Sequence, residues 1–260
     1  MRLFDAHNHL QDARFGGQQD ELIADCAAVS LSRMVVNGTC ESDWPAVAAL
    51  AKRHDCVLPS FGLHPWFVHE RLPEWLAKLG QQLDDCPAAV GEFGLDRWKP
   101  GLGYDGQEEV FTAQLCLAAE RDLPASIHCL KTWGRLHELL RDGPLPKRGA
   151  VLHSYGGPAE MVEPLAKLGA YFSCPGAFAH ERKTRRRDAF RQVPADRLLI
   201  ETDAPDQAPP ENRVTHPLGQ AVNHPANIAA VYEATAELLG QAPDDLAKRV
   251  EENFVRLFGG

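Results

Sequence analysis

Two histidines separated by a single residue lie near the start of the chain, in the segment Asp5-Ala-His7-Asn-His9. The apolar residues just before this segment indicate a short buried strand. Strand side chains repeat every two residues on one side, so Asp5, His7 and His9 are expected to point the same way. Neutral imidazole nitrogen is a good ligand for first-row divalent metals. The pair therefore indicates part of a metal site, and the alternative is a polar strand end with two solvated histidines.

Further residues that can bind metals follow apolar segments along the chain. They are His64, Glu92, His128, His153 and Asp203. Each is expected at the carboxyl end of a strand, and in a closed parallel barrel these ends meet on one face. Even without His64, the remaining four imidazoles and two carboxylates are too many ligands for one tetrahedral ion, so they favour two ions that share a carboxylate. Glu92 is the only candidate on the fourth expected strand for that bridge, because its two oxygens can serve two ions.

The segments that would position these side chains alternate between strand and helix patterns. The first strand is expected to end near residues 3–4, and the others to span 34–37, 57–62, 88–92, 125–128, 150–153, 170–173 and 198–203. Helices are expected at 21–32, 43–53, 73–83, 107–121, 133–141, 159–168, 184–192, 226–239 and 244–258. This alternation favours parallel strands, and its length suits an α/β fold of the (β/α)8 or TIM-barrel type. A doubly wound open sheet is the competing fold.

Composition is that of an ordinary globular protein. The chain has 260 residues, of which 44% are apolar and 24% charged, and this suits one domain over residues 1–260. The absence of a run of about 18 apolar residues predicts no transmembrane helix. Seven scattered cysteines and an N-terminus without a secretory pattern favour a reducing cytoplasm. The formal net charge of −9 disfavours nucleic-acid binding by the surface as a whole.

Short motifs follow one another along the chain in a recognisable order. They are Asp5-Ala-His7-Asn-His9, Gly62-Leu-His64-Pro65, Gly91-Glu92-Phe-Gly94-Leu-Asp96, Ile127-His128-Cys129, Leu152-His153-Ser154 and Glu201-Thr-Asp203-Ala-Pro205. Together they resemble the successive motifs of the TatD family of metal-dependent hydrolases, and the resemblance covers nearly the whole chain. It implies a (β/α)8 barrel with a two-metal site, and hydrolysis of DNA phosphodiesters in the best-known members.

The resemblance also implies which side chains hold the two ions. By matching position, the ligands of the first ion are His7, His9, Glu92 and Asp203. Those of the second ion are Glu92, His128 and His153. Asp203 could in addition accept a proton from the attacking water, which makes Asp203 and Glu92 the candidate catalytic residues. Mixed imidazole and carboxylate ligands accept zinc, manganese, nickel, cobalt, iron or magnesium, so the identity of the metal stays open.

The sequence departs from the family pattern at three places beside the implied ligands. Leu130-Lys131-Thr132-Trp133 follows the fifth-strand histidine, where an Arg-Asp pair is common. Asp206 follows the Glu-Thr-Asp-Ala-Pro motif, where an aromatic residue is common. Asn223-His224-Pro225 stands where Asn-Glu-Pro is usual. These positions do not belong to the implied ligand set. The metal centre is therefore still implied, and the departures leave only the identity of the substrate open.

One basic cluster offers a local contact for an acidic substrate. Its members are Arg182, Lys183, Arg185, Arg186, Arg187 and Arg191. The cluster follows the seventh expected strand, so its start lies on the same face as the metals, and Arg185 and Arg186 are candidate substrate contacts. The alternative is a solvated helix face. His64 is a further candidate, either as a donor to a phosphate oxygen or as a support for the ligands.

These features predict a two-metal hydrolase of phosphoesters, with DNA or oligonucleotide ends as the leading substrate. The ions would lower the pKa of a bound water and polarise the phosphoryl oxygen. A hydrolase of a small amide, ester, lactone or phosphoester is one alternative, since the same site polarises carbonyls. A metal-binding protein without turnover is another. No membrane partner is expected, and a monomer is favoured.

Overall fold

Eight parallel strands form one sheet in the computed structural model, which describes residues 1–99, 101–102, 104, 106–219 and 222–259. The strands are β1 (Leu3–Asn8), β2 (Leu31–Asn37), β3 (Val57–Phe61), β4 (Ala89–Asp96), β5 (Ala125–Leu130), β6 (Ala150–Leu152), β7 (Ala170–Pro175) and β8 (Leu198–Glu201). Each strand pairs with its neighbours in sequence order. The sheet closes where the His9 N–H donates to the Ala204 carbonyl at 2.7 Å, and the Asp203 N–H to the His7 carbonyl at 2.9 Å. The predicted (β/α)8 barrel is confirmed, and a doubly wound open sheet is excluded.

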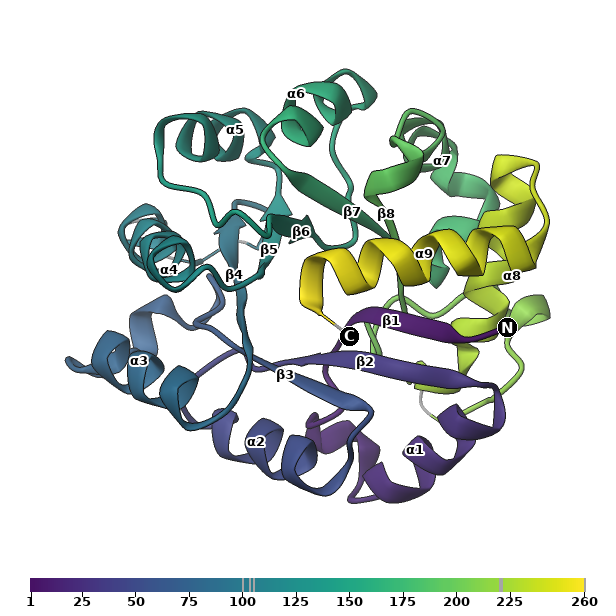
Figure 1. Cartoon of the computed structure of the whole chain (residues 1–260), viewed down its shortest axis with the longest axis horizontal. Coiled ribbons are helices and arrows are strands. Elements are labelled where there is room, and N and C mark those ends of the chain that lie inside the picture. Colours follow the sequence, from purple (N-terminus) through teal and green to yellow (C-terminus); the bar gives the residue numbers. More distant parts are fainter. Residues whose placement is uncertain (100, 103, 105, 220–221, 260) are drawn as a thin grey trace.

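Helices lie around the outside of the strands (Figure 1). They are α1 (Gln19–Ala28), α2 (Trp44–Arg53), α3 (Trp75–Asp85), α4 (Gln107–Arg121), α5 (Trp133–Asp142), α6 (Val162–Lys167), α7 (Thr184–Phe190), α8 (Ile228–Leu239) and α9 (Pro243–Phe258). α3 shows the pattern that holds these helices against the strands. Its buried side chains repeat every four residues and form one stripe, made of Trp75, Leu79 and Leu83. Burying each such side chain contributes about 1.5–3 kcal/mol. In the described part of the chain, no helix is both long and apolar enough to cross a membrane.

The last two helices cover the seam between β1 and β8. The Tyr232 hydroxyl of α8 accepts from the backbone N–H of Phe4 and donates to its carbonyl, both at 3.0 Å. The Asn253 amide of α9 donates to the carbonyl of Leu198 at 2.9 Å. Tyr232 and Asn253 are both almost fully buried. These bonds fix the first and last strands relative to each other, and these are the strands that carry the opening and closing motifs.

The first helix and the second strand differ from the prediction. α1 ends at Ala28 rather than at residue 32, and Ser30 has a left-handed backbone with φ of 65°. β2 begins at Leu31 instead of residue 34. Leu31 is buried and pairs with Leu3 of β1. Pairing with the first strand therefore outweighs the helical pattern of this segment.

β4 is longer than predicted and continues past Glu92 to Asp96. Its register against β5 shifts around Glu92. The pairing continues because Gly94 has no side chain, since a Cβ at this position would lie 2.0 Å from the carbonyl oxygen of His128. Glu92 therefore lies at an irregular point inside a strand rather than at a strand end.

Candidate metal centre

The end of β1 and the segment after β8 bring one group of possible metal ligands together. The Nε2 atoms of His7 and His9 lie 3.3 Å apart. Oε2 of Glu92 lies 3.4 Å from the Nε2 of His7 and 3.2 Å from that of His9. Oδ1 of Asp203 lies 3.8 Å and 3.6 Å from the same two nitrogens. The four residues expected around the first ion thus face one another.

A second group gathers around the other oxygen of Glu92. Its Oε1 lies 3.0 Å from Nδ1 of His128 and 2.7 Å from Nε2 of His153. Those two nitrogens are 3.1 Å apart. Nε2 of His64 lies 3.4 Å from the same oxygen. Glu92 is buried, and it separates two groups of side chains with one oxygen directed at each.

Hydrogen bonds at their outer ring nitrogens orient several of these histidines. Nδ1 of His9 donates to a backbone carbonyl at 2.8 Å, so the neutral ring has its lone pair on Nε2. Nε2 of His128 donates to Asp96 at 3.2 Å, which leaves a lone pair on its Nδ1. Nδ1 of His7 lies 2.8 Å from the hydroxyl of Ser126. Outer nitrogens held in this way, with inner nitrogens left free to bind, are typical of metal-binding histidines.

The donor set fits a divalent metal ion. A tetrahedral ion bound at about 2.1 Å holds its ligand atoms about 3.4 Å apart. Atoms of the first group are separated by 3.2 to 3.8 Å, and those of His128, His153 and Glu92 by 2.7 to 3.1 Å. Lone pairs and carboxylate oxygens that converge at such distances in a buried site are stabilised by a bound cation.

Charges within the cluster shift the pKa values of its own members. Burial lowers the pKa of His153, but the charge and hydrogen bond of Glu92, together with the charges of Asp203 and Glu201, outweigh burial and raise it to about 10. Burial also lowers the pKa of His9, but the hydrogen bond and charge of Glu92, with the Asp203 charge, together outweigh it and raise the pKa to about 9. Burial raises the pKa of Asp203 to about 7. His9 and His153 therefore hold protons at neutral pH in the metal-free protein, and a metal ion has to displace them.

Two further carboxylates, for which no role was predicted, hold the ends of β1 and β8 in place beside the cluster. Asp5 accepts from the backbone N–H and the hydroxyl of Thr202, at 3.0 and 2.5 Å. Glu201 accepts from the backbone N–H and the hydroxyl of Ser154, at 2.7 and 2.5 Å. Both carboxylates are fully buried. The sequence signal that could have found them is an acidic residue two positions before an expected ligand, within an apolar segment.

His64 differs from His9 and His128 because the nitrogen that faces Glu92 carries the proton in its neutral ring. Its Nδ1 accepts from the backbone N–H of Trp66 at 3.1 Å, so a neutral ring carries its proton on Nε2. Burial lowers the pKa of His64 to about 4, which keeps the ring neutral at physiological pH. The Nε2–H is directed at Glu92, at the edge of the cluster. His64 is therefore arranged as a hydrogen-bond donor.

The basic cluster divides into structural and available side chains. Arg187 donates to three backbone carbonyls in the segment before α7. Arg185 and Arg186 form no ion pair within the part of the chain that the structure describes. The Arg186 guanidinium packs on Gly156, where a Cβ would lie 2.2 Å from it. Because Gly156 belongs to the loop after β6, Arg186 reaches the face that carries the metal ligands.

The departures from the family pattern have structural partners. Asp206 forms a two-point ion pair with Arg14, at 2.8 and 3.0 Å, between the loops after β8 and β1. Nδ1 of His224 accepts from the backbone N–H two residues further on, at 2.9 Å. Trp133 is buried against Tyr155, with ring centroids 4.6 Å apart. Asp206 and His224 thus hold loops together, and Trp133 fills part of the core.

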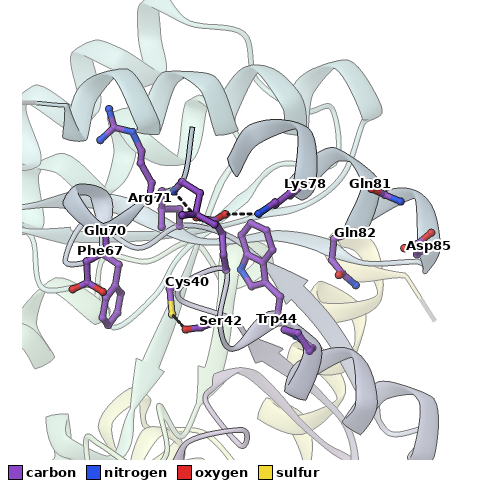
Figure 2. A pocket seen from close by; sticks show the side chains of 14 residues that line it. Cys40, Ser42, Trp44, Phe67, Glu70, Arg71, Lys78, Gln81, Gln82 and Asp85 are labelled. Carbon is purple, nitrogen blue, oxygen red and sulfur yellow. Dashed lines mark hydrogen bonds and ion pairs between the residues drawn. The ribbon is translucent and has the colours of Figure 1, made fainter. Parts of the chain in front are cut away.

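A cavity of about 530 Å³ lies beside the loop that carries His64 (Figure 2). Trp44 of α2, Phe67 of the loop after β3 and Lys78 of α3 contribute to its wall. Lys78 lies 3.7 Å from Glu41, which also lines the cavity. The lining contains none of the predicted metal ligands. The cavity therefore adjoins the metal centre without containing it.

Comparisons with known proteins show which family this chain resembles over its length. The family model described as TatD related DNase matches residues 4–259. The uncharacterized metal-dependent hydrolase YjjV of Escherichia coli K12 is 30% identical over 260 residues, covering 99% of this chain and 98% of that protein. A 3'-5' ssDNA/RNA exonuclease TatD of Enterobacter lignolyticus is 32% identical over 263 residues, with 99% of each chain covered.

Solved structures share the fold. The crystal structure of YjjV, a TatD homologue from Escherichia coli K12, matches with a TM-score of 0.91 and 29% identity, covering 100% of this chain and 98% of that one. A hydrolase of the TatD family from Entamoeba histolytica matches with a TM-score of 0.85 and 19% identity, covering 100% and 99%. At 19% identity, the match to the Entamoeba protein shows only that the two folds are alike.

Proposed function

This chain belongs to the family of TatD-related DNases and is a metal-dependent hydrolase, and we propose that it uses two divalent ions to hydrolyse phosphodiester bonds at the ends of single-stranded nucleic acid. The observation that carries the proposal is the position of Glu92. Its Oε2 faces the histidines of β1, and its Oε1 faces those that follow the middle strands. A carboxylate placed in this way can serve two ions at once.

The two groups of side chains on either side of Glu92 could each hold one ion. His7, His9, Asp203 and Glu92 would hold the first. His128, His153 and Glu92 would hold the second. When bound, the ions supply a water of lowered pKa and positive charge for the phosphate oxygens.

Two side chains of the cluster handle protons in the proposed reaction. Asp203 accepts the proton of the attacking water, as a carboxylate at the edge of the first group. His64 donates a hydrogen bond from its Nε2–H to a phosphate oxygen, and its tautomer suits this role. Glu92 stays ionised, because the charges of the surrounding histidines outweigh burial and hold its pKa well below the usual range.

Relatives and local charge both favour nucleic acid as the substrate. Relatives of this chain are named 3'-5' ssDNA/RNA exonucleases. The net charge of −9 repels a polyanion at long range, so the contact has to be local. Arg185 and Arg186 supply local positive charge on α7. A small number of cations suits strand ends and short oligonucleotides better than a long duplex.

A substrate panel tests the proposal. Metal-free protein is loaded in turn with magnesium, manganese, cobalt, nickel, zinc or iron, and the ions per chain are counted by elemental analysis. The substrates are end-labelled single-stranded DNA and RNA, duplex DNA, bis(p-nitrophenyl) phosphate, and a small amide, ester and lactone. We expect two ions per chain and stepwise loss of nucleotides from single-stranded ends. The Asp203→Asn protein, purified in parallel, controls for contaminating nuclease.

Each contrary result selects an alternative. Turnover of the amide, ester or lactone without cleavage of nucleic acid would make the chain a small-molecule hydrolase. Full metal occupancy without turnover of any substrate would leave a metal-binding protein. A single ion per active chain would remove Glu92 from its bridging role.

A further inference from the structure

The loops after β3 and β4 carry a patch of aromatic and basic side chains outside the metal centre. Its members are Trp66, Arg97, Trp98, Lys99 and Tyr104, and we call it the aromatic rim. The ammonium group of Lys99 lies 4.2 Å from the centre of the Trp66 ring. The guanidinium of Arg97 lies 5.7 Å from the centre of the Tyr104 ring. Trp98 is 55% exposed and Tyr104 is 40% exposed.

Asp96 connects the aromatic rim to the metal centre. Its Oδ2 accepts from the indole N–H of Trp66 at 2.6 Å and lies 3.2 Å from Nε2 of His128. Its Oδ1 accepts from the backbone N–H of Trp98 at 2.6 Å. One buried carboxylate therefore orients a predicted metal ligand and two residues of the rim. The backbone N–H of Trp66 also donates to His64, so the rim lies directly beside the histidine cluster.

The aromatic rim combines exposed aromatic rings with positively charged side chains. A tryptophan as exposed as Trp98 keeps a large apolar surface in water, which contributes little to the stability of the fold. Arg97 and Lys99, on either side of it, are exposed as well. Rings on which bases stack, alternating with cations that bind phosphates, are the elements that recognise single-stranded nucleic acid.

We propose that the aromatic rim is a nucleobase-stacking subsite, which holds the nucleotides next to the scissile phosphodiester of a single strand. The proposal rests on the proposed function, because it concerns the same substrate. Trp98 stacks on a base, while Arg97 and Lys99 contact the neighbouring phosphates. Every base has a face for stacking, so the subsite binds without sequence preference. Trp66, held by Asp96, is already in position before the substrate arrives.

The test combines a change in the protein with a change in the substrate. Trp98 can be replaced without opening the core, because its ring is exposed. On an oligothymidylate, Trp98→Ala should raise KM by about tenfold, the effect of losing one stacked base. On an oligonucleotide with abasic sugars beside the cleaved bond, the same replacement should change KM little. Trp98→Phe should restore most of the binding on the intact strand.

Two controls separate stacking from general damage. Hydrolysis of bis(p-nitrophenyl) phosphate, which has no base to stack, should be unchanged in Trp98→Ala. Val255→Ala removes an exposed apolar side chain from α9 and should leave every substrate unaffected. Binding is read without turnover from the quenching of tryptophan fluorescence by oligothymidylate in metal-loaded Asp203→Asn protein. The quenching should shrink when Trp98→Phe is added.

The outcomes distinguish the subsite from the proposed function. If the wild-type protein hydrolyses only the small phosphodiester and neither binds nor cuts oligonucleotides, the proposed substrate is wrong and the subsite is wrong with it. If it cuts single strands but Trp98→Ala has the same effect on intact and abasic substrates, only the subsite is wrong. An effect confined to intact strands supports both.

Discussion

Glu92 is the residue that both groups of ligands share. Its oxygens lie 2.7 to 3.4 Å from nitrogens of five histidines. Glu92→Ala should therefore lower the metal content from two ions per chain to less than one and abolish hydrolysis. Elemental analysis after dialysis measures the loss, and Glu70→Ala, at an exposed carboxylate, is the control. Two ions retained at full occupancy in Glu92→Ala would contradict the bridge.

Asp203 should affect chemistry more than binding. As the acceptor of the water's proton it acts in the transition state, so Asp203→Asn should lower kcat by about 10²- to 10⁴-fold with a small change in KM. Asp206→Asn is the matched control, because it neutralises a carboxylate three positions away that pairs with Arg14. Steady-state kinetics on bis(p-nitrophenyl) phosphate measures both constants. A raised KM with unchanged kcat would assign Asp203 to binding instead.

The protonated histidines around Glu92 make metal binding depend on pH. The pKa of His153 is raised to about 10 and that of His9 to about 9, so both rings carry protons at pH 7 in the metal-free protein. Metal ligands must be neutral imidazoles, so binding releases these protons. Affinity should rise between pH 7 and pH 9, by up to about tenfold per pH unit for each proton released. Calorimetry in two buffers of different ionisation enthalpy counts the protons, and a count of zero would refute the argument.

At the scale of the elements, local periodicity predicted which residues would meet. The two-residue repeat of β1 correctly indicated that His7 and His9 belong to one group. Apolar runs that end before His153 and Asp203 predicted β6 and β8 within a few residues. The length of β4 was missed, because its pairing past Glu92 depends on the space beside a neighbouring strand. The monomeric state and the cytoplasmic location stay predictions.

Contacts between distant segments could not be predicted from one sequence. Asp96 and His128 are 32 residues apart, and Asp5 and Thr202 are 197 apart. No repeat within a strand or helix encodes such pairings, so the carboxylates that orient the ligands received no role. Within the basic cluster, even adjacent residues have different contacts that the sequence does not reveal. Arg187 follows Arg186 directly, yet its guanidinium bonds to backbone carbonyls and is not available to a substrate.

Asp5 joins the first strand to the segment after the last one. Its carboxylate is fully buried and accepts from the backbone N–H and the hydroxyl of Thr202. Each buried donor left without a partner costs about 1–3 kcal/mol. Asp5→Ala should therefore lower the free energy of unfolding by about 2–6 kcal/mol, measured by urea denaturation. Asp20→Ala, at an exposed ion pair with Arg53, should cost less than about 1 kcal/mol, and an equal loss in both would contradict the role of Asp5.

At the scale of the whole molecule, an acidic protein has to hold an acidic polymer. The net charge of −9 opposes approach at long range, so binding depends on cations close to the cluster. For single strands, the logarithm of affinity falls with the logarithm of salt concentration at a slope of about −0.7 per neutralised phosphate. A footprint of two to four phosphates gives a slope of about −1.4 to −2.8. Such a footprint favours strand ends over processive tracking.

Replacing Arg185 and Arg186 together by Ser should make that slope shallower by about 1.4, if each contacts one phosphate. Arg187 is left intact, because its bonds to backbone carbonyls would confound the result. The control replaces Lys167 and Arg141 by Ser, which changes net charge equally but removes cations outside the basic cluster that are already paired with Glu163 and Asp142. Fluorescence titrations from low to moderate salt measure both slopes, and hydrolysis of bis(p-nitrophenyl) phosphate should be unchanged. If both double variants shift the slope alike, total charge rather than position governs binding, and the basic cluster is only a solvated helix face.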